Sequence, residues 1–100
     1  MIEVQPLHFE EGSAVAVTVR LPKTTLLAVT TDKGYIMCGA LDVSLLNQKL
    51  ADREIIAGRA VGVKTIQQLL DAPLESVTTT AESMGITVGT TGREAIRKML

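Results

Sequence analysis

Between Ala14 and Leu21 the side chains alternate strictly between two sets. In an extended chain, one side would carry Val15, Val17, Val19 and Leu21, and the other side Ala14, Ala16, Thr18 and Arg20. A period of two residues with many β-branched side chains is typical of a half-buried β-strand. This segment therefore predicts that the chain is built on a β-sheet.

Further strands are predicted on both sides of this segment. The first covers Ile2–Phe9, and Pro6 within it cannot donate a hydrogen bond to a neighbouring strand, which favours an edge strand or a bulge. Another covers Leu26–Thr31, after a break at Pro22. The first third of the chain is therefore expected to contain three strands.

A turn at Thr31–Gly34 separates the third strand from an uninterrupted apolar run, Tyr35–Leu41. Such a run is typical of a central strand that is covered on both faces. Asp42 is then placed to cap a helix, in which Val43, Leu46 and Leu50 would share one face. A fifth strand is predicted over Glu54–Val63, so strand, helix and strand would form a βαβ unit.

The remaining chain carries signals for the ends of helices. Capping boxes begin at Thr65, with Gln68, and at Thr91, with Glu94, and each predicts a helix. Between them Pro73 suits the first turn of a further helix, which would bury Leu74, Val77, Ala81 and Met84. Gly85 is expected to end that helix in the left-handed conformation, with Ile86 folded back on Ala81.

These segments predict an α+β fold, a two-layer sandwich in which helices pack on a mostly antiparallel sheet of about five strands. Residues 1–100 are expected to form a single domain, since 100 residues are enough for one core and the apolar share of 46% is normal for a globular protein.

Composition excludes several classes of partner. The net charge is −1 and aromatic residues make up 2% of the chain, so nucleic acid and anionic membranes are not expected partners. No segment approaches the ~18 apolar residues that a membrane span needs, and no signal peptide is evident at the N-terminus. We therefore expect a cytoplasmic protein.

The chain also has few residues that could form a disulfide or bind a metal ion. Cys38 is the single cysteine, which excludes an intrachain disulfide and an all-cysteine zinc site. His8 is the single histidine, so a four-ligand cysteine and histidine site cannot form within one chain. No metal and no cofactor are expected.

Three stretches of the sequence resemble the YunC-like family, a bacterial and archaeal domain of unknown function. They are Leu21–Val29, Lys33–Asp42 and Ala57–Thr65, and the similarity extends over nearly the whole chain. The resemblance implies a two-layer α/β sandwich, in agreement with the segments above. It implies no activity, substrate or cofactor.

Cys38 is the candidate catalytic residue. It precedes a predicted helix, and a helix N-terminus lowers the pKa of a nearby thiol and favours the reactive thiolate. The negative charge of Asp42 opposes this effect, however, and a cysteine inside an apolar strand is more often a packed core residue than a nucleophile.

The candidate ligand-binding residues are Gly39, Asp42 and Arg59. Gly39 would let a ligand approach the backbone closely, while Asp42 and Arg59 would supply opposite charges to an apolar rim at the carboxyl ends of parallel strands. Gly58 and Gly62, which flank Arg59, favour the same place. The alternative is a kinked strand whose arginine is solvated or paired with Asp52 or Glu54.

The glycine- and threonine-rich stretch Gly89–Arg93 is a weaker signal for an anion site, because helix capping explains it without a ligand.

The sequence leaves three classes of function open. We expect a homo-oligomeric small-molecule-binding or regulatory module. The alternatives are a thiol-dependent or acid/base enzyme that uses Cys38 with Asp42, Arg53 or Arg59, and a structural subunit of a larger assembly.

Overall fold

The computed structural model describes residues 1–39, 43–48 and 51–100, and its centre is a six-stranded sheet in which the strands follow one another in chain order. The strands are β1 (Ile2–Phe9), β2 (Gly12–Leu21), β3 (Thr24–Thr30), β4 (Gly34–Met37), β5 (Ile56–Arg59) and β6 (Ser76–Val77). Neighbouring strands are antiparallel except β4 and β5, which are parallel. The sheet is therefore mostly antiparallel, and the predicted α+β class is confirmed.

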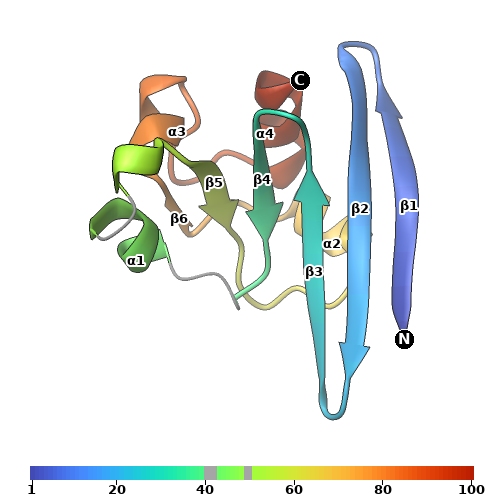
Figure 1. Cartoon of the computed structure of the whole chain (residues 1–100). Helices are drawn as coiled ribbons and strands as arrows, with labels where there is room; N and C mark the ends of the chain where they lie inside the picture. The colour runs from blue at the N-terminus through green and yellow to red at the C-terminus, as the bar shows by residue number, and fades with distance from the viewer. Residues whose placement is uncertain (40–42, 49–50) are drawn as a thin grey trace.

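The helices pack mainly on one side of this sheet. They are α1 (Val43–Gln48), the 3₁₀ helix η1 (Ala51–Arg53), α2 (Ile66–Asp71), α3 (Thr79–Ser83) and α4 (Gly92–Met99). Figure 1 shows α2 and α4 behind the sheet, and α1 and α3 at its β5–β6 end. The β2–β3 hairpin extends below the helices, so part of the sheet has no helix on either face.

The hydrophobic core lies between the sheet and helices α2 and α4. The sheet contributes Leu27, Val29 and Ile36, and the helices contribute Leu69, Ile96 and Met99, all at most 1% exposed. On β2 the buried side chains are Ala14 and Ala16, whose small size allows the helices to approach the sheet. The valine side of β2 therefore faces away from the helices.

Strand β1 forms a free edge of the sheet, as Pro6 predicts. Met1 and Arg20 exchange backbone hydrogen bonds in both directions, with N···O distances of 3.3 Å and 2.8 Å. Hydrogen-bonded and non-hydrogen-bonded pairs alternate along an antiparallel ladder, so Ile2, Val4 and Pro6 direct their backbone groups to the free edge. The missing N–H of Pro6 thus interrupts the open edge, not the ladder to β2.

Two predicted helix starts are confirmed. Thr65 Oγ1 accepts a hydrogen bond from the Gln68 N–H, and Thr91 Oγ1 accepts one from the Glu94 N–H. In the first box the Gln68 side chain reaches back to the N–H of Lys64.

The predicted helix stop at Gly85 is also confirmed. Its φ is +85°, and its N–H donates to the carbonyl of Glu82. The Ile86 N–H donates to the carbonyl of Ala81, which completes the expected Schellman motif.

The helix predicted from Pro73 is wrong. Pro73 instead forms an isolated bridge with Thr91, and Ser76–Val77 form the sixth strand, β6, antiparallel to β5. The helix α3 begins only after Thr78. Pairing with β5 satisfies the backbone groups that a helix over this segment would have bonded internally, and it raises the strand number from about five to six.

Two predicted strands are shorter in the structure. The strand expected over Tyr35–Leu41 ends at Met37, and Tyr35 and Met37 are only half-buried, so β4 is not fully covered on both faces. The strand expected over Glu54–Val63 is reduced to Ile56–Arg59. Asp42 and Leu50, predicted as the cap and a buried residue of α1, lie outside the described residues.

Candidate functional site

Arg59 stands at the carboxyl end of the parallel strand pair. It is the last residue of β5, in register with Met37 of β4 on one side and with Ser76 of β6 on the other. Paired residues in a sheet point to the same face, so Arg59 and Ser76 share the face that is turned away from α2 and α4. The position matches the predicted crevice at the ends of parallel strands.

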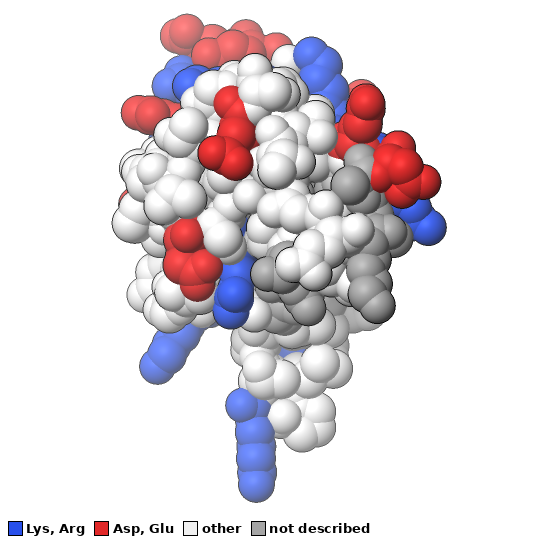
Figure 2. All heavy atoms as spheres, turned by 90° about the vertical axis from the view of Figure 1, so that its left-hand side faces the viewer, with Lys and Arg blue, Asp and Glu red and all other residues white. Residues whose placement is uncertain are grey.

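A pocket of about 300 Å³ opens beside Arg59. It is lined by residues of α1, β5, β6 and α3 and of the loops before β6 and before α4: Val43, Asn47, Arg59, Glu75, Ser76, Val77, Glu82 and Val88. Figure 2 looks onto this end of the molecule, where most of the visible surface is uncharged and the charged groups are scattered. Three valines line the pocket together with five polar or charged residues, so it is more polar than most small-molecule sites, which are predominantly apolar.

The guanidinium of Arg59 makes a long ion pair with Glu75. Its Nη1 lies 3.7 Å from Glu75 Oε2, too long for a strong hydrogen bond, and the two side chains are 32% and 46% exposed. Within the described part of the chain, Arg59 Nε and Ser76 Oγ are buried atoms with no hydrogen-bond partner. Buried polar atoms are normally satisfied, so these two atoms are exceptions, although both are shielded from solvent and a ligand would meet the exposed part of the Arg59 side chain first.

Gly39 lies against the same guanidinium. A Cβ built on Gly39 would be 3.7 Å from Arg59 Nη2 and 3.7 Å from Val61 Cγ1, which is ordinary contact. Two of the predicted ligand-binding residues, Gly39 and Arg59, are thus neighbours, although Gly39 is not among the residues that line the pocket. Asp42, the third, lies outside the described residues. The ion pair expected with Asp52 or Glu54 is made with Glu75 instead.

Cys38 does not join this group. Its side chain is 6% exposed and belongs to the hydrophobic core. Its Sγ lies 3.5 Å from the backbone N of Leu27 and accepts the hydrogen bond that continues the β3–β4 ladder where β4 ends. Cys38 is therefore placed as a core residue, one position before Gly39 but directed away from the pocket.

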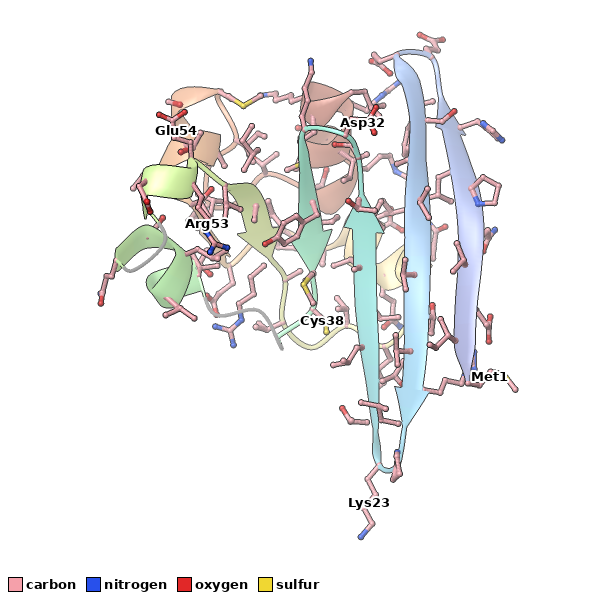
Figure 3. The ribbon with its side chains drawn as sticks, viewed as in Figure 1. Met1, Lys23, Asp32, Cys38, Arg53 and Glu54 are labelled. Carbon is pink, nitrogen blue, oxygen red and sulfur yellow. The ribbon has the colours of Figure 1, made fainter. Side chains whose placement is uncertain are left out.

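The other candidate site residues from the sequence, in the Gly89–Arg93 stretch and at Arg53, do not form a site. In the Gly89–Arg93 stretch, Thr91 caps α4, the Gly92 N–H donates to the carbonyl of Ala72, and Arg93 pairs with Asp71 at 3.0 Å. Arg53 is exposed on η1, apart from Cys38, as Figure 3 shows. Neither place offers a further site.

Among the described residues, Arg59 is the one lining residue of the pocket that the sequence predicted as a site residue; the polar lining residues that it missed are Asn47, Glu75, Ser76 and Glu82. Glu75 and Ser76 reach the pocket only because the segment forms β6, and the sequence had favoured a helix there. Asn47 Oδ1 accepts a hydrogen bond from the Thr79 N–H at 3.0 Å, which ties α1 to α3 at the pocket edge. A polar residue on a short helix gives no sequence signal for such a contact.

The described residues contain no group of three or more histidine, cysteine, aspartate or glutamate side chains that could hold a metal ion. None of the helices in the described ranges is long and apolar enough to cross a membrane.

Comparison with known proteins places the chain in a family. The model of a family described as "Domain of unknown function (DUF1805)" matches residues 37–99. The chain belongs to this family. It is 63% identical over 100 residues to the "Uncharacterized protein YunC" of Bacillus subtilis (strain 168), a match that covers 100% of this chain and 99% of the relative. The YunC-like resemblance is therefore confirmed.

A solved structure has the same fold. The crystal structure of a protein of unknown function, TA1206 from Thermoplasma acidophilum, matches with a TM-score of 0.89 and 29% identity, over 100% of this chain and 94% of that one. The descriptions of these relatives name no ligand or reaction.

Proposed function

We propose that this chain is a cytosolic, homo-oligomeric module that binds a small molecule, as a binding or regulatory protein, in the pocket beside Arg59. The observation that carries the proposal is Arg59 itself, which lines the pocket with its side chain 32% exposed and, among the described residues, makes only a 3.7 Å ion pair with Glu75. A guanidinium with free N–H groups is suited to a carboxylate or phosphate.

The other charges of the pocket narrow the class of ligand. Glu75 and Glu82 also line it, so a ligand with several negative charges would be repelled. A volume of about 300 Å³ is at the small end of ligand sites. The pocket therefore favours a small carboxylic acid that also carries an amino group or hydroxyls, with its carboxylate at Arg59 and its donors at the glutamates.

The thiol-dependent alternative receives no support from the site. The thiol of Cys38 is buried, and its sulfur already accepts a hydrogen bond from the Leu27 N–H. A nucleophile must be able to reach its substrate, and the reactive cysteines of enzymes lie in partly exposed electropositive surroundings. Binding is therefore proposed in preference to thiol catalysis.

A thermal-shift and calorimetric screen tests the proposal. The probes are free amino acids and hydroxycarboxylic acids, with inorganic phosphate and dicarboxylic acids as comparison compounds. We expect an amino or hydroxy acid to raise the melting temperature. Arg59→Met should weaken its binding by at least about tenfold, since it removes a charge-assisted hydrogen bond.

Arg97→Met is the matched control. Arg97 pairs with Glu11 at 3.2 Å and is 42% exposed, away from the pocket. Its substitution should leave the affinity unchanged. If no small acid binds, or if Arg59→Met binds as well as the unsubstituted protein, the proposed function is wrong.

A further inference from the structure

The outer face is the side of strands β1–β4 that is turned away from α2 and α4. By register it carries Ile2, Val4, Pro6, His8, Ser13, Val15, Val17, Val19, Leu21, Thr24, Leu26, Ala28, Thr30, Tyr35 and Met37. No Asp, Glu, Lys or Arg is among these residues. Ile2, Val4, Val15 and Leu21 are 67%, 66%, 38% and 45% exposed. An antiparallel sheet with one solvated face normally places polar side chains there.

In the part of β1 and β2 that extends below the helices, charged side chains lie on the helix side of the sheet and apolar side chains lie on the outer face. In Figure 3, Met1 at the start of β1 and Lys23 at the tip of the β2–β3 hairpin both lie below the helices. The charged side chains of strands β1 and β2, Glu3 and Arg20, lie on the helix side of the sheet, where they pair at 2.9 Å and are each 52% exposed. The apolar side chains Ile2 and Val4 lie on the outer face. The solvated side is therefore the helix side, and the outer face has the composition of a covered surface.

We infer that the outer face is the contact surface between two copies of this chain, packed sheet against sheet. The inference rests on the homo-oligomer of the proposed function and identifies its surface. A two-fold contact brings each part of the face against the same face of the partner, so a charge would meet its own kind. An uncharged face avoids that repulsion.

The size of the outer face fits a dimer. With about 4.8 Å between strands and about 3.3 Å per residue, β1–β4 present a flat area of roughly 450 Å². Stable complexes bury about 800 Å² of accessible surface per partner, so the relief of the side chains must add to this flat area in a stable contact. The flat area lies within the about 300–600 Å² of the largest patch on a typical monomer, and such patches are often functional.

The free edge of β1 supports the same geometry. The backbone nitrogen of Pro6 faces that edge and carries no hydrogen, so edge-to-edge pairing of two β1 strands would lack a hydrogen bond at its centre. Face-to-face packing of two sheets needs no free edge and buries side chains instead.

Two adjacent residues of β1 provide a matched pair of variants. Val4 and Gln5 are both exposed, and they point to opposite faces of the sheet. Val4→Lys places an ammonium group on the outer face, and Gln5→Lys places one on the helix side. Neither position is buried in one copy of the chain, so circular dichroism should show both variants folded.

Light scattering coupled to gel filtration gives the decisive measurement. The unsubstituted protein and Gln5→Lys should have twice the mass of one chain, 10.7 kDa. Val4→Lys should be a monomer, because an unpaired charge in the contact weakens it by roughly 100-fold or more. A monomeric unsubstituted protein, or a Val4→Lys variant as dimeric as Gln5→Lys, would overturn the inference. The Arg59→Met variant separates this test from the ligand test, since it should stay dimeric.

Discussion

At the scale of single residues, Thr78 joins three parts of the fold. Among the described residues it is the one buried polar residue, with 2% of its surface exposed. Its Oγ1 accepts hydrogen bonds from the N–H of Ala57 at 3.1 Å and from the N–H of Ala81 at 3.3 Å, and its own N–H donates to the carbonyl of Ala57. One hydroxyl thus extends the β5–β6 ladder and caps α3, which together form one wall of the pocket.

Thr78→Ala should lower the free energy of unfolding by about 2–3 kcal/mol, because it leaves the buried Ala57 N–H without its partner and removes a helix cap. Thr78→Ser keeps the hydroxyl and loses one methyl group, so it should cost only about 1 kcal/mol. Urea unfolding at one protein concentration measures both. Equal losses for the two variants would show that the methyl, not the hydroxyl, carries the effect.

At the scale of elements, the helices α2 and α4 cross at a glycine. Gly92 begins α4, and its N–H donates to the carbonyl of Ala72 just after α2. A Cβ at this position would overlap the carbonyl oxygen of Leu69 and lie 2.8 Å from Ile36 Cδ1. Arg93 and Gln67 hydrogen-bond the carboxylate of Asp71 beside this crossing, and these bonds, that of Gln67 first, hold the pKa of Asp71 below its ordinary value.

Gly92→Ala should therefore destabilise the protein by about 1–3 kcal/mol or more, although alanine is the better helix former by about 1 kcal/mol. The overlap is with backbone, which cannot rotate away. Gly39→Ala is the control, because its Cβ would meet nothing closer than 3.7 Å and its φ is not positive. That variant should change the unfolding free energy by less than about 0.5 kcal/mol. A Gly92→Ala protein as stable as the control would show that α2 and α4 can separate without cost.

Local signals predicted the elements whose ends are set by their own side chains. Thr65, Thr91 and Gly85 bond within their own turns, so the sequence near each residue contains the whole interaction. The segment after Pro73 behaves differently. Its helical pattern is real, but Ser76 and Val77 gain hydrogen bonds from β5, which is distant in the sequence. Local patterns cannot include that partner.

The same limit applies to the candidate site. The rule for parallel strands placed Arg59 and Gly39 correctly beside each other, since it depends only on the order of strand, helix and strand. Cys38 was predicted near them because it precedes Gly39 in the sequence, but alternation along the chain directs its side chain into the core. The alternation in β2 likewise separated valines from alanines, but it could not show that the alanines would be the buried set.

At the scale of the whole molecule, the two proposed surfaces are separate. The outer face covers β1–β4, and the pocket is lined by residues of β5, β6, α1 and α3, which lie at the other end of the sheet. Met37 belongs to the outer face and is in register with Arg59, so the two surfaces meet at one point only. A dimer packed on the outer face would therefore reach the boundary of the pocket at Met37.

The stability of such a dimer should depend on protein concentration. Folding and association are linked by mass action, so the melting temperature of the unsubstituted protein should rise by roughly 3–6 °C for each tenfold increase in concentration. Gln5→Lys should show the same dependence. Val4→Lys should melt at a temperature that does not change with concentration, because its monomer unfolds alone. Differential scanning calorimetry over two decades of concentration measures the slope. A concentration-independent melting temperature for all three proteins would contradict the dimer even where gel filtration showed a large particle, since a weak or non-specific contact would leave the folded chain no more stable.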